Sequence, residues 1–220
     1  MNLKGNLSIA FLISFISLMG FGVMAVLVSK QTIVHFDSTI ISFVQSFEAT
    51  MLTSIMKFFT VIGGAKLIVV ISLLVLFLLY KVLKHRSELI LFIAVIAGAN
   101  VLFASLKLLF HRERPDLHRL IEASNYSFPS GHATNAFALY GIITFLLWRH
   151  IPSRLVRIIL IILGVFMILT IGLSRIYLGV HYPSDVIAGY FISACWLTFA
   201  IWFFQRYKEK QYERKKTSER

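Results

Sequence analysis

Six apolar segments, each close in length to a membrane-spanning helix, constrain the fold of this chain more than any other feature of its sequence. A helix of about 20 residues crosses roughly 30 Å of hydrocarbon, and the longest of these segments reach that length. Hydrophobic residues make up 58% of the 220 residues, whereas a soluble globular domain contains about 45–50%. No alternating ten-residue pattern recurs, which argues against a transmembrane β-barrel. The sequence therefore predicts an all-α integral membrane protein.

The apolar segments predict one bundle of six transmembrane helices, without an internal repeat or a second folded domain. The expected ranges are about 7–28, 67–83, 89–110, 132–148, 155–173 with an extension towards 178, and 183–204. The first segment is longer than the apolar core of a signal peptide and has no clear small-residue cleavage pattern, so we expect it to be retained. Pro115 ends the third helix, because the residue before a proline avoids the helical region, and Pro183 suits the first turn of the sixth.

The segment between the first two predicted spans is less hydrophobic than the spans themselves. Apolar residues recur there at helical spacing from Phe36 to Phe47, and Asp37 and Ser38 near the start are candidate caps. This pattern predicts a short amphipathic helix in the membrane interface, and Gly63-Gly64 separates it from the second span. Two roles stay open for the segment: a packed linker, or a surface that admits lipid.

The formal net charge of +12 arises mainly from basic residues in short loops and near the C-terminus. In a soluble protein this charge would suggest a nucleic-acid partner. In a six-helix bundle, however, Lys4, the turns at 84–86 and 149–157 and the basic tail fall on one side, which the positive-inside rule assigns to the cytoplasm. The sequence thus predicts a membrane domain over 1–205 and a basic cytoplasmic tail over 206–220, both termini cytoplasmic, and no nucleic-acid partner. We expect the tail to be frayed or disordered and able to bind anionic lipid.

Two polar stretches, 107–132 and 174–185, interrupt the apolar sequence. The parity of the predicted helices places both of them on the face opposite the cytoplasm. The first stretch carries four Lys and Arg residues against the positive-inside rule, and binding of an anion would explain them. We therefore expect the two stretches to meet in one anion-binding site.

Several residues of the two stretches suit a phosphate group. Lys107, Arg114 and Arg175 offer a point charge and two guanidinium forks. If the third helix continues past residue 110, Lys107 and Arg114 share one of its sides; alternatively, both extend to the lipid headgroups. Ser130 and Gly131 precede the fourth helix, whose first N–H groups attract anions, although an ordinary turn with Ser130 as N-cap explains them equally well.

His132 and His181 are the candidate reactive groups. A lone histidine at a membrane face is usually an interfacial residue, but here two of them accompany three cations. Asp185, four residues after His181, could accept the Nδ1–H of that ring and leave Nε2 free. Asp185 also suits the N-terminus of the sixth helix, and both roles can coexist. The single cysteine, Cys195, lies in an apolar run and indicates neither a disulfide nor a zinc site.

Three segments in this order, Lys107-x6-Arg114-Pro115, Pro129-Ser130-Gly131-His132 and Ser174-Arg175-x5-His181-x3-Asp185, resemble the three signature motifs of the type 2 phosphatidic acid phosphatase superfamily. No motif position departs from the pattern. With the six-helix layout the resemblance covers essentially the whole chain. In size and layout the chain is similar to the bacterial phosphatidylglycerophosphatase B group, which extends to undecaprenyl diphosphate phosphatases.

The resemblance implies a hydrolase that needs neither a metal nor another cofactor and no obligate protein partner. Such an enzyme would act on a lipid phosphate that stays in the bilayer of the cell membrane. His181 would be the nucleophile that forms a phosphohistidine, Asp185 would orient it, and His132 would protonate the leaving group. The phosphoryl oxygens would be held by Lys107, Arg114 and Arg175, helped by Ser130 and Gly131.

The substrate implied first is phosphatidylglycerophosphate, hydrolysed to phosphatidylglycerol. An undecaprenyl diphosphate phosphatase and a broad-specificity lipid phosphatase are alternatives, because the motifs contact only the phosphoryl group. A transporter of anionic lipid would need the cations but not the histidine–aspartate pair, and transporters usually show internal repeats. Vanadate-dependent oxidation, known from related soluble haloperoxidases, fits poorly with six spans.

Overall fold

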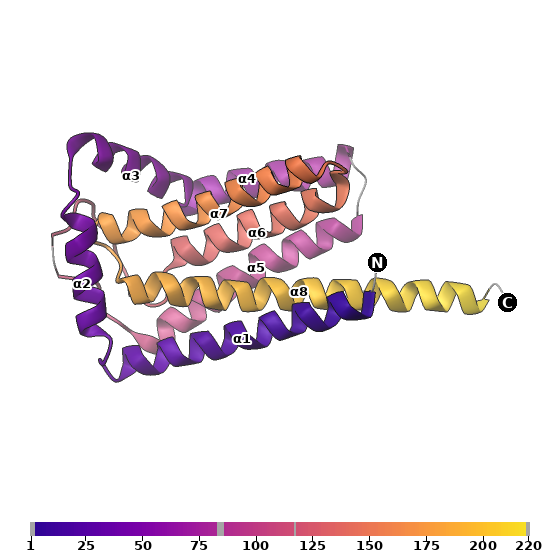
Figure 1. Ribbon diagram of the computed structural model, residues 1–220, viewed down its shortest axis with the longest axis horizontal. Helices are drawn as coiled ribbons and strands as arrows, with labels where there is room; N and C mark the ends of the chain where they lie inside the picture. Colours follow the sequence, from indigo (N-terminus) through magenta and orange to yellow (C-terminus); the bar gives the residue numbers. More distant parts are fainter. Residues whose placement is uncertain (1–2, 83–85, 117, 219–220) are drawn as a thin grey trace.

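The computed structural model describes residues 3–82, 86–116 and 118–218, and the regular structure in these ranges is helical. The helices are α1 (Leu3–Ser29), α2 (Val34–Gln45), α3 (Thr50–Ile62), α4 (Ala65–Phe77), the short π-helix η1 (Leu78–Val82), α5 (Arg86–Phe110), α6 (Gly131–His150), α7 (Arg154–Tyr177) and α8 (Pro183–Ser218). The long helices run side by side and α2 lies across one end of them (Figure 1). The prediction of an all-α bundle is confirmed.

The number of membrane spans differs from the predicted six. Among the described residues, four helices are long and apolar enough to cross a membrane: α1, α5, α7 and α8. A further candidate is the pair Thr50–Ile62 and Ala65–Lys81, which is bent by 52°. The count is therefore four, or five with the bent pair, and the six-span prediction is not confirmed. The break in the pair falls at Gly63-Gly64, as expected.

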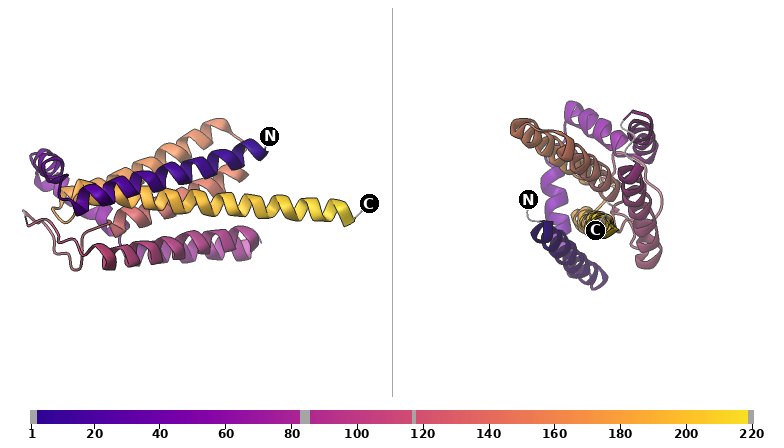
Figure 2. Two further views of the ribbon diagram at one scale, coloured as in Figure 1. Left: turned by 90° about the horizontal axis from the view of Figure 1, so that it is seen from below. Right: turned by 90° about the vertical axis from the view of Figure 1, so that its right-hand side faces the viewer.

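Helix α6, the predicted fourth span, lies inside the bundle. It contacts α4, α5, α7 and α8, and its residues from 131 to 146 are buried or half-buried; Figure 2 shows the bundle from its side and along its length. Its polar residues Thr134 and Asn135 are buried. A helix that is enclosed by other helices does not need the uniformly apolar surface that lipid requires.

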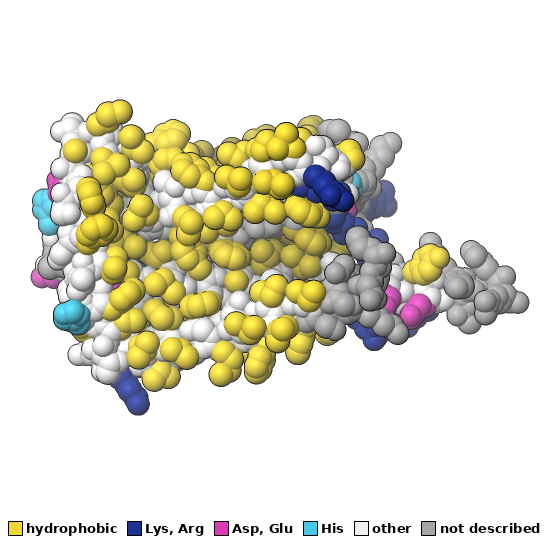
Figure 3. All heavy atoms as spheres, in the orientation of Figure 1, with side chains coloured by type: hydrophobic (Ala, Val, Ile, Leu, Met, Phe, Trp, Pro, Cys, Tyr) yellow, Lys and Arg dark blue, Asp and Glu magenta, His cyan; other side chains and the backbone are white. Residues whose placement is uncertain are grey.

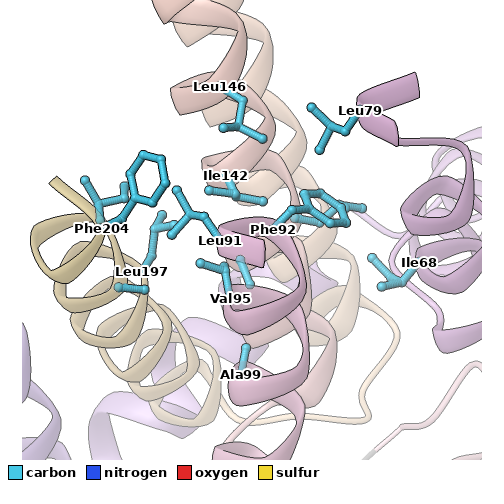
Figure 4. Packing of buried hydrophobic residues seen from close by; sticks show 14 residues of the cluster. Ile68, Leu79, Leu91, Phe92, Val95, Ala99, Ile142, Leu146, Leu197 and Phe204 are labelled. Atoms are coloured by element: carbon cyan, nitrogen blue, oxygen red, sulfur yellow. The ribbon is translucent and has the colours of Figure 1, made fainter. Parts of the chain in front are cut away.

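The main apolar core lies towards the end of the bundle that is remote from α2. It joins α4, η1, α5, α6 and α8 through buried residues such as Phe92, Val95, Ile142 and Leu197 (Figure 4). On the sides of the bundle, apolar side chains are exposed, whereas charged and histidine side chains gather at the two ends (Figure 3). Such an exposed apolar band is stable in lipid and not in water, so the chain is a membrane protein.

The segment after α1 holds one helix more than the sequence predicts. Helix α2 covers most of the amphipathic pattern, but α3 follows it and packs along α7. Asp37 does not cap α2. Its carboxylate instead accepts hydrogen bonds from Ser184 at the start of α8 and from Arg112, because α2 is placed across the ends of both chain segments.

The predicted fraying after residue 205 is wrong for the described part of the tail. Helix α8 continues through Ser218 and extends beyond the rest of the bundle (Figures 1 and 2). The residues there are mostly Lys, Arg, Glu and Gln, which are good helix formers. An ion pair between Arg206 and Glu209, 2.8 Å apart, lies on its surface.

Candidate active site

The two polar stretches meet at the end of the bundle where α2 lies. The amide of Leu120 donates a hydrogen bond to the carbonyl of Leu178 over 3.1 Å, and the amide of Ser130 donates to the carbonyl of Asp185 over 3.0 Å. The contact deduced from helix parity is therefore present, and the candidate residues lie around it.

His181 and Asp185 form a buried pair. The imidazole Nδ1 lies 3.3 Å from Oδ2 of Asp185, and the side chains are almost entirely inaccessible to solvent. The same carboxylate oxygen accepts a hydrogen bond from the amide of Tyr182 over 3.0 Å. Because Pro183 starts α8, Asp185 lies in its first turn. The carboxylate thus contacts both the helix N-terminus and the imidazole, and the two expected roles coexist.

The other ring nitrogen of His181 faces a cation. Nε2 lies 3.2 Å from Nη1 of Arg114, and a guanidinium can only donate hydrogen bonds. Nε2 must therefore accept, which leaves the ring proton on Nδ1, opposite Asp185. Burial first, and then the positive charges of Arg175, Arg114 and Lys107, lower the pKa of His181 well below its ordinary value of 6.5. The ring is therefore neutral, with a free electron pair on the side of the cations, as a nucleophile requires.

The three candidate cations are held by neutral oxygen atoms. Lys107 Nζ donates to the carbonyl of Tyr126 over 2.8 Å, and the hydrogen bonds of Arg114 reach the carbonyls of Ser124, Asn125 and Val180. Carbonyl oxygens orient a cation without cancelling its charge. The positive charge of the site thus remains available for a phosphate dianion, and both side chains turn into the site instead of reaching the headgroups.

Arg175 is the most buried of these cations, with 5% of its surface exposed. Its Nη1 donates a hydrogen bond to the hydroxyl of Thr60 at the end of α3. Among the described residues, no atom accepts a hydrogen bond from its Nε. A buried guanidinium with a free donor is suited to an incoming oxyanion, because an unpaired donor in such a place is costly.

Arg114 reaches the site by a route that differs from the predicted one. Helix α5 ends at Phe110, and His111 adopts a φ of 48°, in the left-handed region. Residues with this conformation terminate helices. Lys107 is therefore on the helix whereas Arg114 is on the loop after it, and the expected common helix face does not exist.

His132 lies in the first turn of α6, on the side of the site formed by α3. A Cβ atom added to Gly63 would lie 3.4 Å from Cδ2 of His132, and the imidazole donates a hydrogen bond to the backbone carbonyl of Thr60. The positive charges of Arg175 and Lys107 act on His132, and His181 is close enough to interact with it. Both candidate histidines thus belong to one site.

Ser130 and Gly131 have structural roles that the sequence allowed. The Ser130 hydroxyl accepts a hydrogen bond from the amide of Ala133 over 3.4 Å, so Ser130 is the N-cap of α6. A Cβ atom at Gly131 would lie 3.0 Å from the ring of Phe103, so a larger residue there would have to displace that ring slightly. Contact of either residue with phosphate stays a prediction.

Sequence reasoning missed four residues around the site: Asp37, Thr60, Arg112 and Ser184. A carboxylate in a mostly apolar segment is a signal that could have identified Asp37, because such groups are costly in a membrane. Thr60 and Ser184 carry no comparable signal. Within the part of the chain that the structure describes, no group of three or more His, Cys, Asp and Glu residues is arranged to hold a metal ion.

Comparison with known proteins gives a consistent result. The sequence profile of the PAP2 superfamily matches residues 88–209. Phosphatidylglycerophosphatase B of Bacillus subtilis (strain 168) is 40% identical over 103 residues, which are 46% of this chain and 50% of that protein. The undecaprenyl-diphosphatase of Sulfolobus acidocaldarius is 38% identical over 76 residues, or 34% of this chain and 32% of that protein. The chain therefore spans half or less of the length of these two curated relatives.

Two crystal structures resemble the fold of most of this chain. The transmembrane PAP2 type phosphatidylglycerolphosphate phosphatase from Bacillus subtilis superposes with a TM-score of 0.78 at 25% identity, covering 90% of this chain and 96% of that one. Aquifex aeolicus LpxE superposes with a TM-score of 0.61 at 23% identity, covering 76% and 94%. The second likeness concerns the fold alone.

Proposed function

The chain belongs to the PAP2 superfamily, and we propose that it is a membrane lipid phosphatase that works through a covalent phosphohistidine at His181. One observation carries this proposal. Nδ1 of His181 faces Asp185 while Nε2 faces Arg114, so a neutral, oriented nucleophile points to where three cations converge. A site that only bound anionic lipid would need the cations but not the oriented imidazole.

The proposed reaction has two displacements at phosphorus. Nε2 of His181 attacks, the bond from phosphorus to the leaving oxygen breaks, and His132, which the bound phosphate dianion would keep protonated, gives that oxygen its proton. Water then attacks the phosphohistidine, and His132 takes the proton of the water. Asp185 accepts the Nδ1–H throughout and stabilises the positive ring. No step requires a metal or another cofactor.

The cations stabilise charge on the phosphoryl oxygens. Lys107, Arg114 and Arg175 surround His181 closely enough to lower its pKa, and a phosphoryl group in transfer spreads negative charge over three oxygens. Arg114 would exchange its contact with Nε2 for one with a phosphoryl oxygen. At the N-terminus of α6, Gly131 would add its N–H and Ser130 its O–H as donors on the same side, since the Ser130 amide already donates to Asp185.

We propose phosphatidylglycerophosphate as the substrate. Support comes from the similarity to the phosphatidylglycerophosphatase B of Bacillus subtilis in sequence and to a phosphatidylglycerolphosphate phosphatase in fold. Undecaprenyl diphosphate is the alternative that the relative from Sulfolobus favours, and a broad specificity for lipid phosphates is the other. In each case the acyl or prenyl chains stay in the bilayer, along the exposed apolar sides of the bundle.

We propose that the site faces the outside of the cell membrane. The N-terminus of α1 and the C-terminus of α8 lie towards the end of the bundle opposite α2 (Figure 1). That end also carries the basic residues Arg149, Arg154 and Arg157 around the turn between α6 and α7, which the positive-inside rule assigns to the cytoplasm; the predicted basic turn at 84–86 lies largely outside the described residues. The site is at the α2 end and is therefore extracytoplasmic.

Phosphate release from purified protein in detergent tests the function. The substrates are phosphatidylglycerophosphate, undecaprenyl diphosphate and phosphatidic acid, each with and without EDTA, and His181→Ala is the control. We expect the highest kcat/KM for phosphatidylglycerophosphate, no effect of EDTA, and no release by His181→Ala. Release that survives in His181→Ala would refute the mechanism, and equal rates on all lipids would indicate a broad specificity.

A further inference from the structure

Behind the His181–Asp185 pair, Arg112 lies between two buried carboxylates. Its Nη1 is 2.6 Å from Oδ1 of Asp185, and its Nη2 is 2.8 Å from Oδ2 of Asp37. The side chains of Asp37 and Asp185 are 1% and 0% exposed. The guanidinium also stacks on the ring of Tyr182, 3.9 Å from its centre. Arg112 is thus fixed on both edges and on one face.

Ser184 closes the network at the N-terminus of α8. Its hydroxyl donates to Oδ2 of Asp37 over 2.6 Å, and its amide donates to Oδ1 over 2.9 Å. The hydroxyl in turn accepts a hydrogen bond from Nη1 of Arg112 over 2.7 Å. Asp37 therefore binds α8 and Arg112 at once, and α2 is held across the end of the bundle by these contacts.

The two oxygens of Asp185 have different partners. Oδ2 faces His181 and the amide of Tyr182, whereas Oδ1 faces Arg112. A carboxylate held at both oxygens cannot rotate about its bond to Cβ. Arg112 thus determines which oxygen is presented to the imidazole, and a charge-assisted contact of this kind is strong in a buried site.

The charges of the network also favour the proposed reaction. Asp37 and Asp185 carry two negative charges and Arg112 one positive charge, which leaves one excess negative charge beside His181. The imidazole becomes positive when Nε2 bonds to phosphorus, and this charge is then balanced. Removing the charge of Asp37 would leave a neutral network that stabilises the charged ring less.

We propose that Arg112 and Asp37 are positioning residues for the nucleophile, acting through Asp185 and not through the substrate. The proposal rests on the proposed function of His181. Arg112 is one of several basic residues of its loop, so contact with phosphate is the competing explanation. Its two terminal nitrogens, however, are occupied by Asp37, Asp185 and Ser184 on the side of the carboxylate away from the ring.

The test compares Arg112→Met, Asp185→Asn and the double variant in the rate of phosphoenzyme formation and in KM. Arg112→Met should slow phosphorylation about 10- to 100-fold, by analogy with the loss of a residue that orients a metal ligand, with little change in KM. Arg112→Lys should recover part of the rate. In the Asp185→Asn background, Arg112→Met should cause almost no further loss, because two residues that act as one unit are not additive. A raised KM, or losses that multiply, would show that Arg112 binds substrate and would overturn the proposal.

Two controls separate folding from positioning. Arg119→Met removes an exposed arginine of the same loop that bonds to the carbonyl of Pro115, and it should keep full activity. Thermal unfolding of every variant reports on folding. If Arg112→Met does not fold, Asp37→Asn makes the same comparison without a change in shape, and an unchanged phosphorylation rate there would refute the proposal. Absence of phosphoenzyme in the wild-type protein would instead refute the proposed function.

Discussion

The guanidinium of Arg175, at the end of α7, donates a hydrogen bond to the hydroxyl of Thr60, 115 positions earlier in the chain. The backbone of the same threonine faces the ring of His132. The end of α3 is therefore a wall of the candidate site, in contact with a phosphate-binding candidate and with the candidate acid. The bend between α3 and α4 brings this wall into place.

Thr60→Val tests this wall, because valine keeps the shape and removes the hydroxyl. Loss of one partner from a buried charged hydrogen bond costs about 1–3 kcal/mol, and we expect it mainly as a higher KM, since Arg175 would be less well oriented for phosphate. Steady-state kinetics with the lipid substrate measure the effect. Ser54→Ala, which removes an exposed hydroxyl of α3 that bonds only within the helix, should change neither parameter. An unchanged KM in Thr60→Val would show that this contact from α3 does not contribute to substrate binding.

Arg175→Lys should lower kcat/KM. We expect the loss of transition-state stabilisation to be about 2–4 kcal/mol, by analogy with the loss of a transition-state donor. Lysine keeps the charge but loses the planar fork and the free Nε donor. The matched control is Arg157→Lys at the other end of α7, where the arginine bonds to the carbonyl of Ile151, and it should retain activity. Equal losses in both variants would point to a general effect on α7.

The alanine variants of the two histidines should differ in whether they form the phosphoenzyme and how long it lasts. His181→Ala should form no phosphoenzyme with any substrate. His132→Ala should form it slowly from a lipid and faster from a nitrophenyl phosphate, whose leaving group needs little protonation, and the phosphohistidine should then persist. Asp185→Asn should weaken His181 by favouring the wrong tautomer. Mass spectrometry of rapidly quenched protein locates the acid-labile phosphate. Finding it on His132 would reverse the assignment.

The lowered pKa of His181 predicts a ring that stays neutral below pH 6.5. In the unfolded chain the same ring gains its proton near the ordinary value, so a fall in pH through 6.5 favours unfolding and removes stability that is present above it. Nitrogen NMR of histidine-labelled protein, from about pH 8 to about pH 5.5, should show a neutral His181 ring throughout. The signal of His181 is the one that disappears in His181→Ala. A midpoint near 6.5 would contradict the burial of the ring between cations.

The orientation of the site can be tested with single cysteines in a Cys195→Ser background. Glu122 is exposed on the loop beside the site, whereas Arg154 is exposed at the opposite end, at the start of α7. Glu122→Cys should react with an impermeant thiol reagent in intact cells, and Arg154→Cys only after lysis. The reverse pattern would place the site in the cytoplasm.

The sequence by itself determined the helical class and most of the helix positions, because apolar runs and prolines act locally. It also determined that the 107–132 and 174–185 stretches meet, since helix parity fixes the face of each loop. The pairing of His181 with Asp185 followed from the one-turn spacing at the start of α8, where Pro183 sets the first turn.

Only the tertiary structure decided which residues surround that pair. Arg114 was expected on a helix, but the left-handed conformation of His111 ends that helix and puts Arg114 on a loop. Hydrophobic periodicity does not predict the φ angle of a single residue. Asp37 and Thr60 reach the site because α2 and α3 fold over the end of the bundle. Their partners are far away in the sequence, and contacts of that kind depend on how helices pack, which no local pattern encodes.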